Sequence, residues 1–278
     1  MPQTLALSAG NFAVPTDTNI AQLRTAGSGS AANIQLVRNS DSVALPLSGA
    51  SFVPSSSPQA PGFNYSLLAN GGDVINNSNL VFSNKADTLV IASKTSATAY
   101  NNTAIASNSS FSFANGNNSF EVKGGARNLS IQSGTGNDNI KIQGSVLSGG
   151  INIQTGAGTD TVTIGGTATN AQISTEAGND RISVTGNVTN STFNAGLGAD
   201  VLVFGGTART SVAINLGGAA DRSIDTITFN KSRVNLADLS GVTITGESSG
   251  DLLIIGSTRY VYSSTADRWV NGTTRLSF

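Results

Sequence analysis

Apolar and polar residues alternate along much of this chain, in short segments that recur at a nearly fixed interval. Four segments between residues 126 and 206 share one phrase, which is SGTGNDNIKIQG, TGAGTDTVTIGG, TEAGNDRISVTG and AGLGADVLVFGG. Their aspartates, Asp138, Asp160, Asp180 and Asp200, are 22, 20 and 20 residues apart. A fixed period of that size is typical of a solenoid, in which each repeat is one structural unit.

The positions around each aspartate predict two strands in every repeat. Seven residues before each aspartate stands a large apolar residue, and two and four residues after it stand two more. The first set is Ile131, Ile153, Ile173 and Phe193. The second set is Ile140, Ile142, Val162, Ile164, Ile182, Val184, Leu202 and Phe204. Alternation with a period of two places these side chains on one face of a strand. Each repeat should therefore hold two strands and two corners, one of which is rich in glycine and ends in aspartate.

Stacking such coils would place equivalent residues above one another at the ~4.8 Å spacing of paired strands, so that the apolar positions form one continuous interior. The same register extends to Leu80 before Asp87, Phe111 before Asn118, Ile214 before Asp221 and Ile244 before Asp251. We therefore predict an all-β fold, a parallel β-solenoid of the β-helix or β-roll type with about eight coils of about 20 residues. Extra residues are expected at positions 91–110, 222–225 and 230–239.

The residues outside the clear repeats predict three further segments. Residues 1–53 contain the apolar runs LALSA, NIQLV and SVALPL, which indicate a small N-terminal β subdomain or an arm. Residues 54–62, PSSSPQAPG, predict a linker. The solenoid would then cover residues 63–257, and residues 258–278 would form a C-terminal β-hairpin cap with aromatic residues on either side of a polar turn. Such a cap would cover the interior that the last coil leaves open, which is the role we expect for Trp269.

Composition narrows the classes of function. The chain has 278 residues, of which 11% are charged, and a net charge of −1, which gives no electrostatic basis for binding nucleic acid or an anionic membrane. It has no cysteine and no histidine, which excludes thiol nucleophiles, disulfides, imidazole bases and the usual zinc ligands. The opening residues lack a basic segment followed by an apolar run, and no stretch approaches 18 apolar residues. We therefore expect neither a cleaved leader nor a membrane span.

The corner phrase resembles the haemolysin-type calcium-binding (RTX) repeat of β-roll proteins, whose pattern is GGxGxD followed by an apolar residue. The matching glycines are Gly134, Gly136, Gly156, Gly158, Gly178, Gly196 and Gly198. The resemblance implies that carbonyls and carboxylates of successive turns hold calcium, a cation that prefers oxygen ligands. Only one corner of each coil carries the phrase, and its first glycine is replaced in all four units. Calcium would therefore form a single row along Asp138, Asp160, Asp180 and Asp200.

A second role for these aspartates needs no metal. Carboxylates about 5 Å apart repel by roughly 1 kcal/mol per neighbour in water, and by more where solvent is excluded. A row of four therefore needs either a bound cation or hydrogen-bond donors. Aspartate and asparagine side chains commonly accept hydrogen bonds from the backbone of their own turn, and Asn118 takes the equivalent place in an earlier coil. The sequence leaves both metal binding and turn closure open.

Enzymatic activity is not expected. A β-helix enzyme that cuts acidic polysaccharides needs charged residues that converge on one face, in the case of carboxylates at a defined separation. Lys141, Arg181 and Arg209 instead fall on different positions of the coil. Thr161 and Thr163 form a Thr-x-Thr pair, but neighbouring coils do not repeat it, which excludes a flat ice-binding lattice.

Two non-enzymatic functions remain. The composition, rich in Asn, Ser, Thr and Gly, and the segment YVYSSTADRWV resemble phage structural proteins. That resemblance implies a structural or attachment protein of the virion, such as a fibre, spike or capsid-decorating subunit. Its partners would be other virion proteins, further copies of the chain and a host-surface glycan. The alternative, implied by the corner phrase, is a secreted extracellular RTX-like module that depends on calcium for binding or for forming a surface layer.

The outward face of the second strand predicts a contact surface. The outward residues are polar in the early coils but are Val201, Val203, Leu252 and Ile254 in the later ones, with threonines at 226 and 228 between them. Contiguous apolar strips on a sheet face usually mark a contact surface. We expect this strip to be covered either by another subunit or by the C-terminal hairpin.

Overall fold

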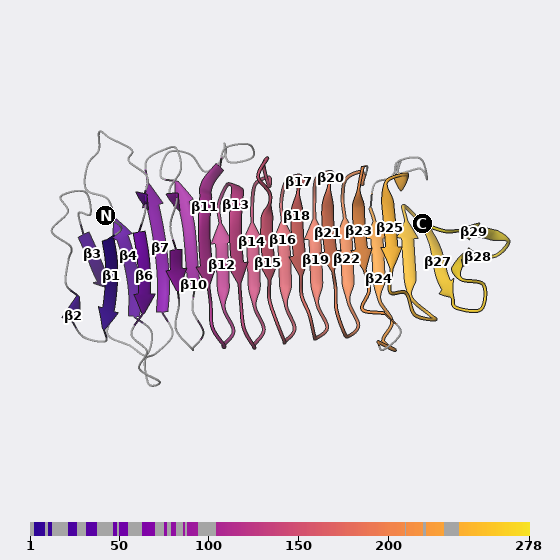
Figure 1. The fold of residues 1–278 in the computed structure, drawn as a ribbon, viewed down its shortest axis with the longest axis horizontal. Coiled ribbons are helices and arrows are strands. Elements are labelled where there is room, and N and C mark those ends of the chain that lie inside the picture. The colour runs from indigo at the N-terminus through magenta and orange to yellow at the C-terminus, as the bar shows by residue number, and fades with distance from the viewer. Residues whose placement is uncertain are drawn as a thin grey trace.

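The computed structural model of the chain is an elongated rod of β-strands (Figure 1). The structure describes residues 86, 88–91, 106–208, 210–218, 221–230 and 239–278 with their side chains, and elsewhere the backbone of the strands alone. None of the described residues forms a helix long and apolar enough to span a membrane.

Two long sheets run along the rod, and we call them sheet 1 and sheet 2. From the first strand described in part with side chains onward, sheet 1 contains β11 (Ala104–Ser112), β13 (Gly125–Gln132), β15 (Ile151–Gln154), β18 (Ala171–Ser174), β21 (Ser191–Asn194), β23 (Val212–Asn215) and β25 (Val242–Thr245). The matching strands of sheet 2 are β10 (Thr88–Ser93), β12 (Ser119–Val122), β14 (Asn139–Ile142), β16 (Thr161–Ile164), β19 (Arg181–Val184), β22 (Val201–Phe204), β24 (Thr226–Phe229) and β26 (Leu252–Ile255). The chain alternates between the two sheets, and these neighbours pair in parallel. This arrangement confirms the predicted parallel β-solenoid.

The described coils make about six turns rather than eight. Of the eight predicted coils, the first, at Leu80 and Asp87, lies mostly outside the residues described with side chains. A further small sheet pairs β17 (Ala168–Thr169) with β20 (Val188–Thr189) at the second corner.

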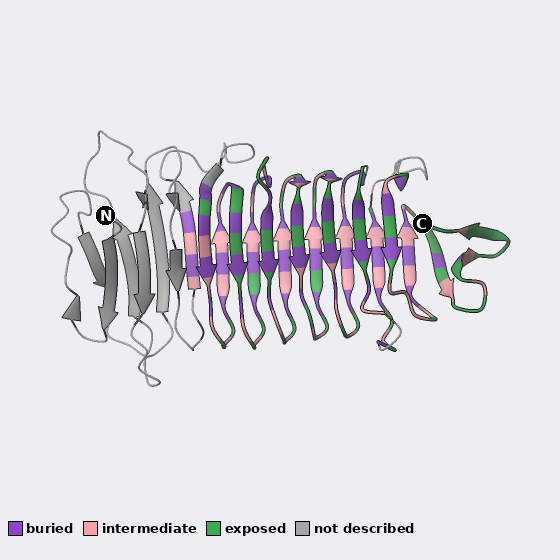
Figure 2. Cartoon of the chain, in the orientation of Figure 1, coloured by how far each residue is buried: buried purple, intermediate pink, exposed green. Residues whose placement is uncertain are grey.

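The interior is a continuous apolar column, as the period predicts. Strand register places Ile131, Ile153, Ile173, Phe193, Ile214 and Ile244 side by side on sheet 1. Each is at most 3% exposed. Figure 2 shows the alternation of buried and more exposed positions along most strands of the described coils. Since burying one such side chain contributes about 1.5–3 kcal/mol, the stacked column is the main stabilising feature of the rod.

The glycine corners permit coils to stack closely. A Cβ atom at Gly158 would clash with the carbonyl oxygen of Gly136 in the preceding coil, and a Cβ atom at Gly178 would clash with that of Gly158. Gly158 and Gly178 both have a φ of +150°. Only glycine fits such an approach without displacing the backbone. The third repeat has Glu176 in place of a glycine, and this residue adopts a left-handed φ of 66°.

One register prediction is wrong. The sequence places Asp221 at the corner of its coil, followed by extra residues 222–225, whereas β24 begins directly after Asp225. Asp225 therefore occupies the corner, and the extra residues of this coil precede it. Asp221 instead accepts a hydrogen bond from the backbone N–H of Ser223 within the resulting loop. The insertion predicted at 230–239 lies mostly outside the described residues.

The strands before residue 82 join the same two sheets. In sheet 1 they are β1 (Gln3–Ser8), β2 (Asn11–Phe12), β5 (Leu47–Ser48), β6 (Ala50–Pro54), β8 (Ile75–Asn76) and β9 (Asn79–Val81), and in sheet 2 they are β3 (Gln22–Ala26), β4 (Ala32–Val37) and β7 (Phe63–Ala69). Strands are thus present at two of the predicted runs, LALSA and NIQLV. Most of the SVALPL run and of the linker lies outside the described residues, and the domain boundaries stay predictions.

The C-terminal residues extend sheet 2 with three antiparallel strands, β27 (Thr258–Ser263), β28 (Arg268–Asn271) and β29 (Thr274–Leu276). The Trp269 side chain is 1% exposed and belongs to the core cluster. Its ring meets that of Tyr262 edge-on, with centroids 5.4 Å apart. The aromatic side chains of this segment therefore cover the end of the interior, while the segment continues the sheet edge to edge instead of folding over its outer face.

Candidate functional site

The four aspartates of the repeated phrase stack into one buried column along the rod. The column, as the structure shows it, runs through Asn118, Asp138, Asp160, Asp180, Asp200, Asp225 and Asp251. All seven side chains are at most 2% exposed. We call this set the aspartate column. Its members lie immediately before the strands of sheet 2, so the position of each is fixed by the strand that follows it.

Each carboxylate of the aspartate column accepts a hydrogen bond from the coil before it. The backbone N–H of Asn118 donates to Oδ1 of Asp138 at 2.7 Å, and the same contact repeats up to Asp225 and Asp251, where it is 3.0 Å. We predicted donors within the aspartate's own turn. Asp251 has such donors, the backbone N–H and the hydroxyl of Ser248, whereas the backbone donor that repeats along the column belongs to the neighbouring coil. Hydrogen bonds to a charged group contribute about 1.5–3 kcal/mol each. The column therefore ties successive coils together at their corners.

In four aspartates of the column, the second carboxylate oxygen is buried without a partner. Oδ2 of Asp138, Asp160, Asp180 and Asp200 has no hydrogen bond to any described residue. Burial raises the pKa of every aspartate in the column, although the backbone N–H bonds lower it in part. The pKa rises to about 6 for Asp180, about 7 for Asp225 and about 8 for Asp200, where neighbouring carboxylates add to the effect. Burial therefore favours a bound proton, or a cation that balances the charge, at these carboxyls.

Three carboxylates meet at one corner near the C-terminal end of the column. Oxygens of Asp200, Asp221 and Asp225 lie within 4.8 Å of one another, and all three residues are buried. Asp221 also accepts the backbone N–H of Gly198 at 2.9 Å through Oδ2. Among the described residues this is the one group of three acidic side chains with such a spacing. Hard oxygen ligands of this kind suit a divalent cation such as calcium.

The acidic corner and the predicted calcium row overlap only at Asp200. Asp138, Asp160 and Asp180 lie in the same column, and a calcium row along them stays a prediction. The sequence interpretation missed Asp221 and Asp225 as partners of Asp200, because both belong to the longer coil whose register was misplaced. The sequence does contain one indication of this acidic corner, which is the presence of two aspartates four residues apart in the same coil.

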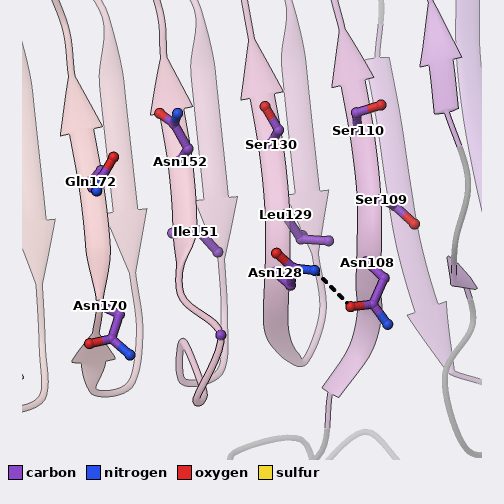
Figure 3. A pocket seen from close by; sticks show the side chains of 11 residues that line it. Asn108, Ser109, Ser110, Asn128, Leu129, Ser130, Ile151, Asn152, Asn170 and Gln172 are labelled. Carbon is purple, nitrogen blue, oxygen red and sulfur yellow. Dashed lines mark hydrogen bonds between the residues drawn. The ribbon is translucent and has the colours of Figure 1, made fainter.

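A second feature is a cleft of about 580 Å³ on the outer face of sheet 1, lined from β11, β13, β15 and β18 (Figure 3). Ser110, Ser130, Asn152 and Gln172 follow one another across it in strand register. A second row at the corner holds Asn108, Asn128 and Asn170, all with a left-handed φ of 47–56°. The sequence interpretation missed these asparagines, although they recur at the period of the coils.

The corner row of asparagines is interrupted at one coil. Asn128 donates from Nδ2 to Oδ1 of Asn108 at 2.8 Å (Figure 3). The next equivalent position is Gly150, which has a φ of 69°, and Asn170 follows it. A Cβ at Gly150 would clash with the backbone carbonyl oxygen of Asn170, so the coil spacing leaves no room for a side chain. The row therefore has a gap in the middle of the cleft.

The predicted apolar strip lies on the outer face of sheet 2. Val201 and Leu252 flank Thr226 in register, and Val203 and Ile254 flank Thr228. All four apolar residues are half-buried. Val261 pairs with Leu252, is 40% exposed, and carries the strip into the C-terminal strands. A contact surface at this strip stays a prediction.

Lys141 and Arg181, two of the cations considered for catalysis, lie on different strands of sheet 2. The Lys141 ammonium pairs with the Glu121 carboxylate at 3.1 Å on neighbouring strands of sheet 2. Arg181 is exposed on β19, and Arg209 lies outside the described residues.

Comparison of the chain with protein-family models, with curated proteins and with solved structures finds no match. The function must therefore be inferred from the structure itself. The features available are the rod, the aspartate column at its corners, the cleft on sheet 1 and the apolar strip on sheet 2.

Proposed function

We propose that the chain is a non-enzymatic structural and attachment protein, which acts as a fibre, spike or decorating subunit of a virus particle. The observation that supports this most is the uninterrupted pairing of both sheets, from β11 and β12 to β25 and β26. Every coil is bound to the next by strand hydrogen bonds and by the aspartate column. Such a stack forms a stiff spacer, because each repeat is held by its neighbours over its whole length.

The outer surface agrees with a role in assembly. The apolar strip of sheet 2 is concentrated near the C-terminal end, whereas the equivalent positions on β12, β14, β16 and β19 are polar or charged. An apolar patch with a polar surround is typical of a subunit contact. We infer that copies of the chain associate through this end and leave the more N-terminal coils free for other contacts.

The location of the protein tests this function. Mass spectrometry of purified particles from a producing culture should detect the chain at a fixed ratio to the capsid protein, and antibodies should label projections in electron micrographs. Detection only in particle-free culture medium would contradict the virion assignment and favour a secreted module instead.

The second candidate function is that secreted module, calcium-dependent and of the RTX-like type. The specific observation in its favour is the acidic corner of Asp200, Asp221 and Asp225, where Oδ2 of Asp200 is buried and unpartnered. The three side chains fit a hard divalent cation, which would balance their charge and fix the loop to the corner. A cation that binds only the folded chain would stabilise it by linkage.

A further inference from the structure

We propose that the cleft on sheet 1 binds a neutral glycan chain that lies along the rod. This inference rests on the proposed attachment function and names its ligand class. The cleft has a volume of about 580 Å³, which lies within the range of about 300–1,000 Å³ usual for small-ligand sites.

The chemistry of the lining favours an uncharged ligand rich in hydroxyl groups. The described residues that line the cleft are asparagine, glutamine, serine, glycine, leucine and isoleucine, with no ionisable side chain among them. Each amide supplies two donors and an acceptor, and each hydroxyl supplies both functions. A phosphate would require arginine or lysine, and a metal ion would require carboxylates. Alternating donors and acceptors on a neutral surface match the hydroxyl groups of a sugar.

The arrangement of the side chains favours an extended ligand. Ser130, Asn152 and Gln172 are exposed and stand on adjacent strands. Strand pairing spaces them by ~4.8 Å along the rod, so a linear chain would meet them in succession. Their side chains make no hydrogen bond within the described part of the chain that would have to be broken first. Because they project from paired strands, binding orders little of the protein backbone.

The asparagine row adds amide groups along the corner edge of the cleft. Gly150 stands between Asn128 and Asn170 in register, so these two residues are separated by two strand spacings, about 10 Å. Leu129 and Ile151 contribute little surface to the cleft, because they are only 3% and 4% exposed and alternate with the outward Ser130 and Asn152. A sugar unit on this face would therefore meet mainly amide and hydroxyl groups. Single-site binding of this kind is weak and gains strength when several copies act together.

The test measures binding of the full chain to an immobilised panel of neutral oligosaccharides built from glucose, galactose, mannose and N-acetylglucosamine. We expect retention on at least one neutral member. The double variant Asn152→Ala and Gln172→Ala should lower that binding by about 10-fold, since two hydrogen-bonding side chains are lost. The matched control is Thr161→Ala and Thr163→Ala, which changes two neutral polar residues on sheet 2 in the same part of the rod and should bind as the wild type does. Unchanged melting temperatures establish that both variants are folded.

Three outcomes would overturn the inference. The wild-type chain could bind no neutral glycan, or the cleft variant could bind as well as the control. Binding confined to sialylated or uronic acid members, and lost in Arg127→Ala, would instead assign an acidic ligand to the flank of the cleft. None of these outcomes changes the location of the protein in particles, so failure of the glycan site and failure of the structural function are distinguishable.

Discussion

The backbone N–H of Asp160 donates a hydrogen bond to Oδ1 of Asp180 at 2.7 Å, across a sequence separation of 20 residues. The separation equals the length of the coil, so the aspartate contacts its own equivalent in the next repeat. The same side chain leaves Oδ2 buried and unpartnered. The Asp180 carboxylate therefore joins two coils by a hydrogen bond, and its burial at the corner also costs desolvation free energy when it is ionised.

Replacing Asp160 tests how much the column stabilises the rod. Asp160→Ala removes the acceptor for the backbone N–H of Asp138, and leaving that buried donor unsatisfied should destabilise the fold by about 1–3 kcal/mol. Asp160→Asn keeps an oxygen that can accept and removes the buried charge, so it should be much milder. Urea denaturation followed by circular dichroism would measure both. Equal destabilisation by the two substitutions would show that the hydrogen bond is not the stabilising element.

The column also predicts that the rod is more stable in acid than at neutral pH. Burial raises the folded-state pKa of Asp180 from an ordinary value of 3.8 to about 6. A folded state that holds its proton more tightly than the unfolded chain is stabilised below the unfolded pKa, and this stabilisation is lost as pH rises through the folded value. The melting temperature in EDTA should therefore fall between about pH 4 and pH 7.

Asp180→Asn should make that pH profile shallower, because it removes one of the titrating carboxyls of the column while its size and shape are kept. A melting temperature that rises steadily from pH 4 to pH 7 in the wild-type chain would contradict the direction of the pKa shifts. Working in EDTA keeps any cation at the acidic corner from contributing to the profile.

The coils and their core could be predicted from the sequence because a solenoid repeats in one dimension. Ile153 is seven residues before Asp160. Its register neighbours Ile131 and Ile173 likewise stand seven residues before Asp138 and Asp180, so one period predicts both burial and register in these coils. Substituting Ile153 by Asp should unfold at least the adjacent coils, since an unpaired buried charge costs several kcal/mol. Limited proteolysis around residues 131–173 would reveal the opening, and an intact digestion pattern would argue against the buried column.

The candidate sites depend on contacts between residues of different coils, and the repeat length alone does not predict these contacts. In the sequence, either Asp221 or Asp225 could be the corner aspartate of its coil. Only the start of β24 in the structure identifies Asp225 as the corner residue. The cleft depends on the strand register that places Asn152 beside Gln172. It also depends on the single coil in which Gly150 interrupts the row of asparagines. The backbone donors that repeat along the aspartate column come from the neighbouring coil, so considering each turn alone does not identify them.

Calcium should raise the melting temperature if the acidic corner holds a cation. The expected increase is reversed by EDTA and abolished in Asp221→Asn, which removes a ligand outside the column. Asp160→Asn is the matched control, because it changes one buried aspartate away from the corner and should keep the response. A melting curve that is the same with calcium and with EDTA would leave hydrogen bonding and protonation as the whole explanation of the column.

The apolar strip predicts association of the chain near its C-terminal end. Val203 and Ile254 flank Thr228 on the outer face of sheet 2, and the β-hairpin extends this face without covering it. Changing both residues to lysine should leave the coils folded, because the side chains point away from the interior, but should place two like charges in the contact and prevent association. Light scattering coupled to gel filtration would measure the change in mass. Lysines at Thr161 and Thr163, two outward positions in a polar part of the same sheet, provide the control and should leave the mass unaltered. A Val203→Lys and Ile254→Lys chain that still associates like the wild type would show that the subunits meet elsewhere.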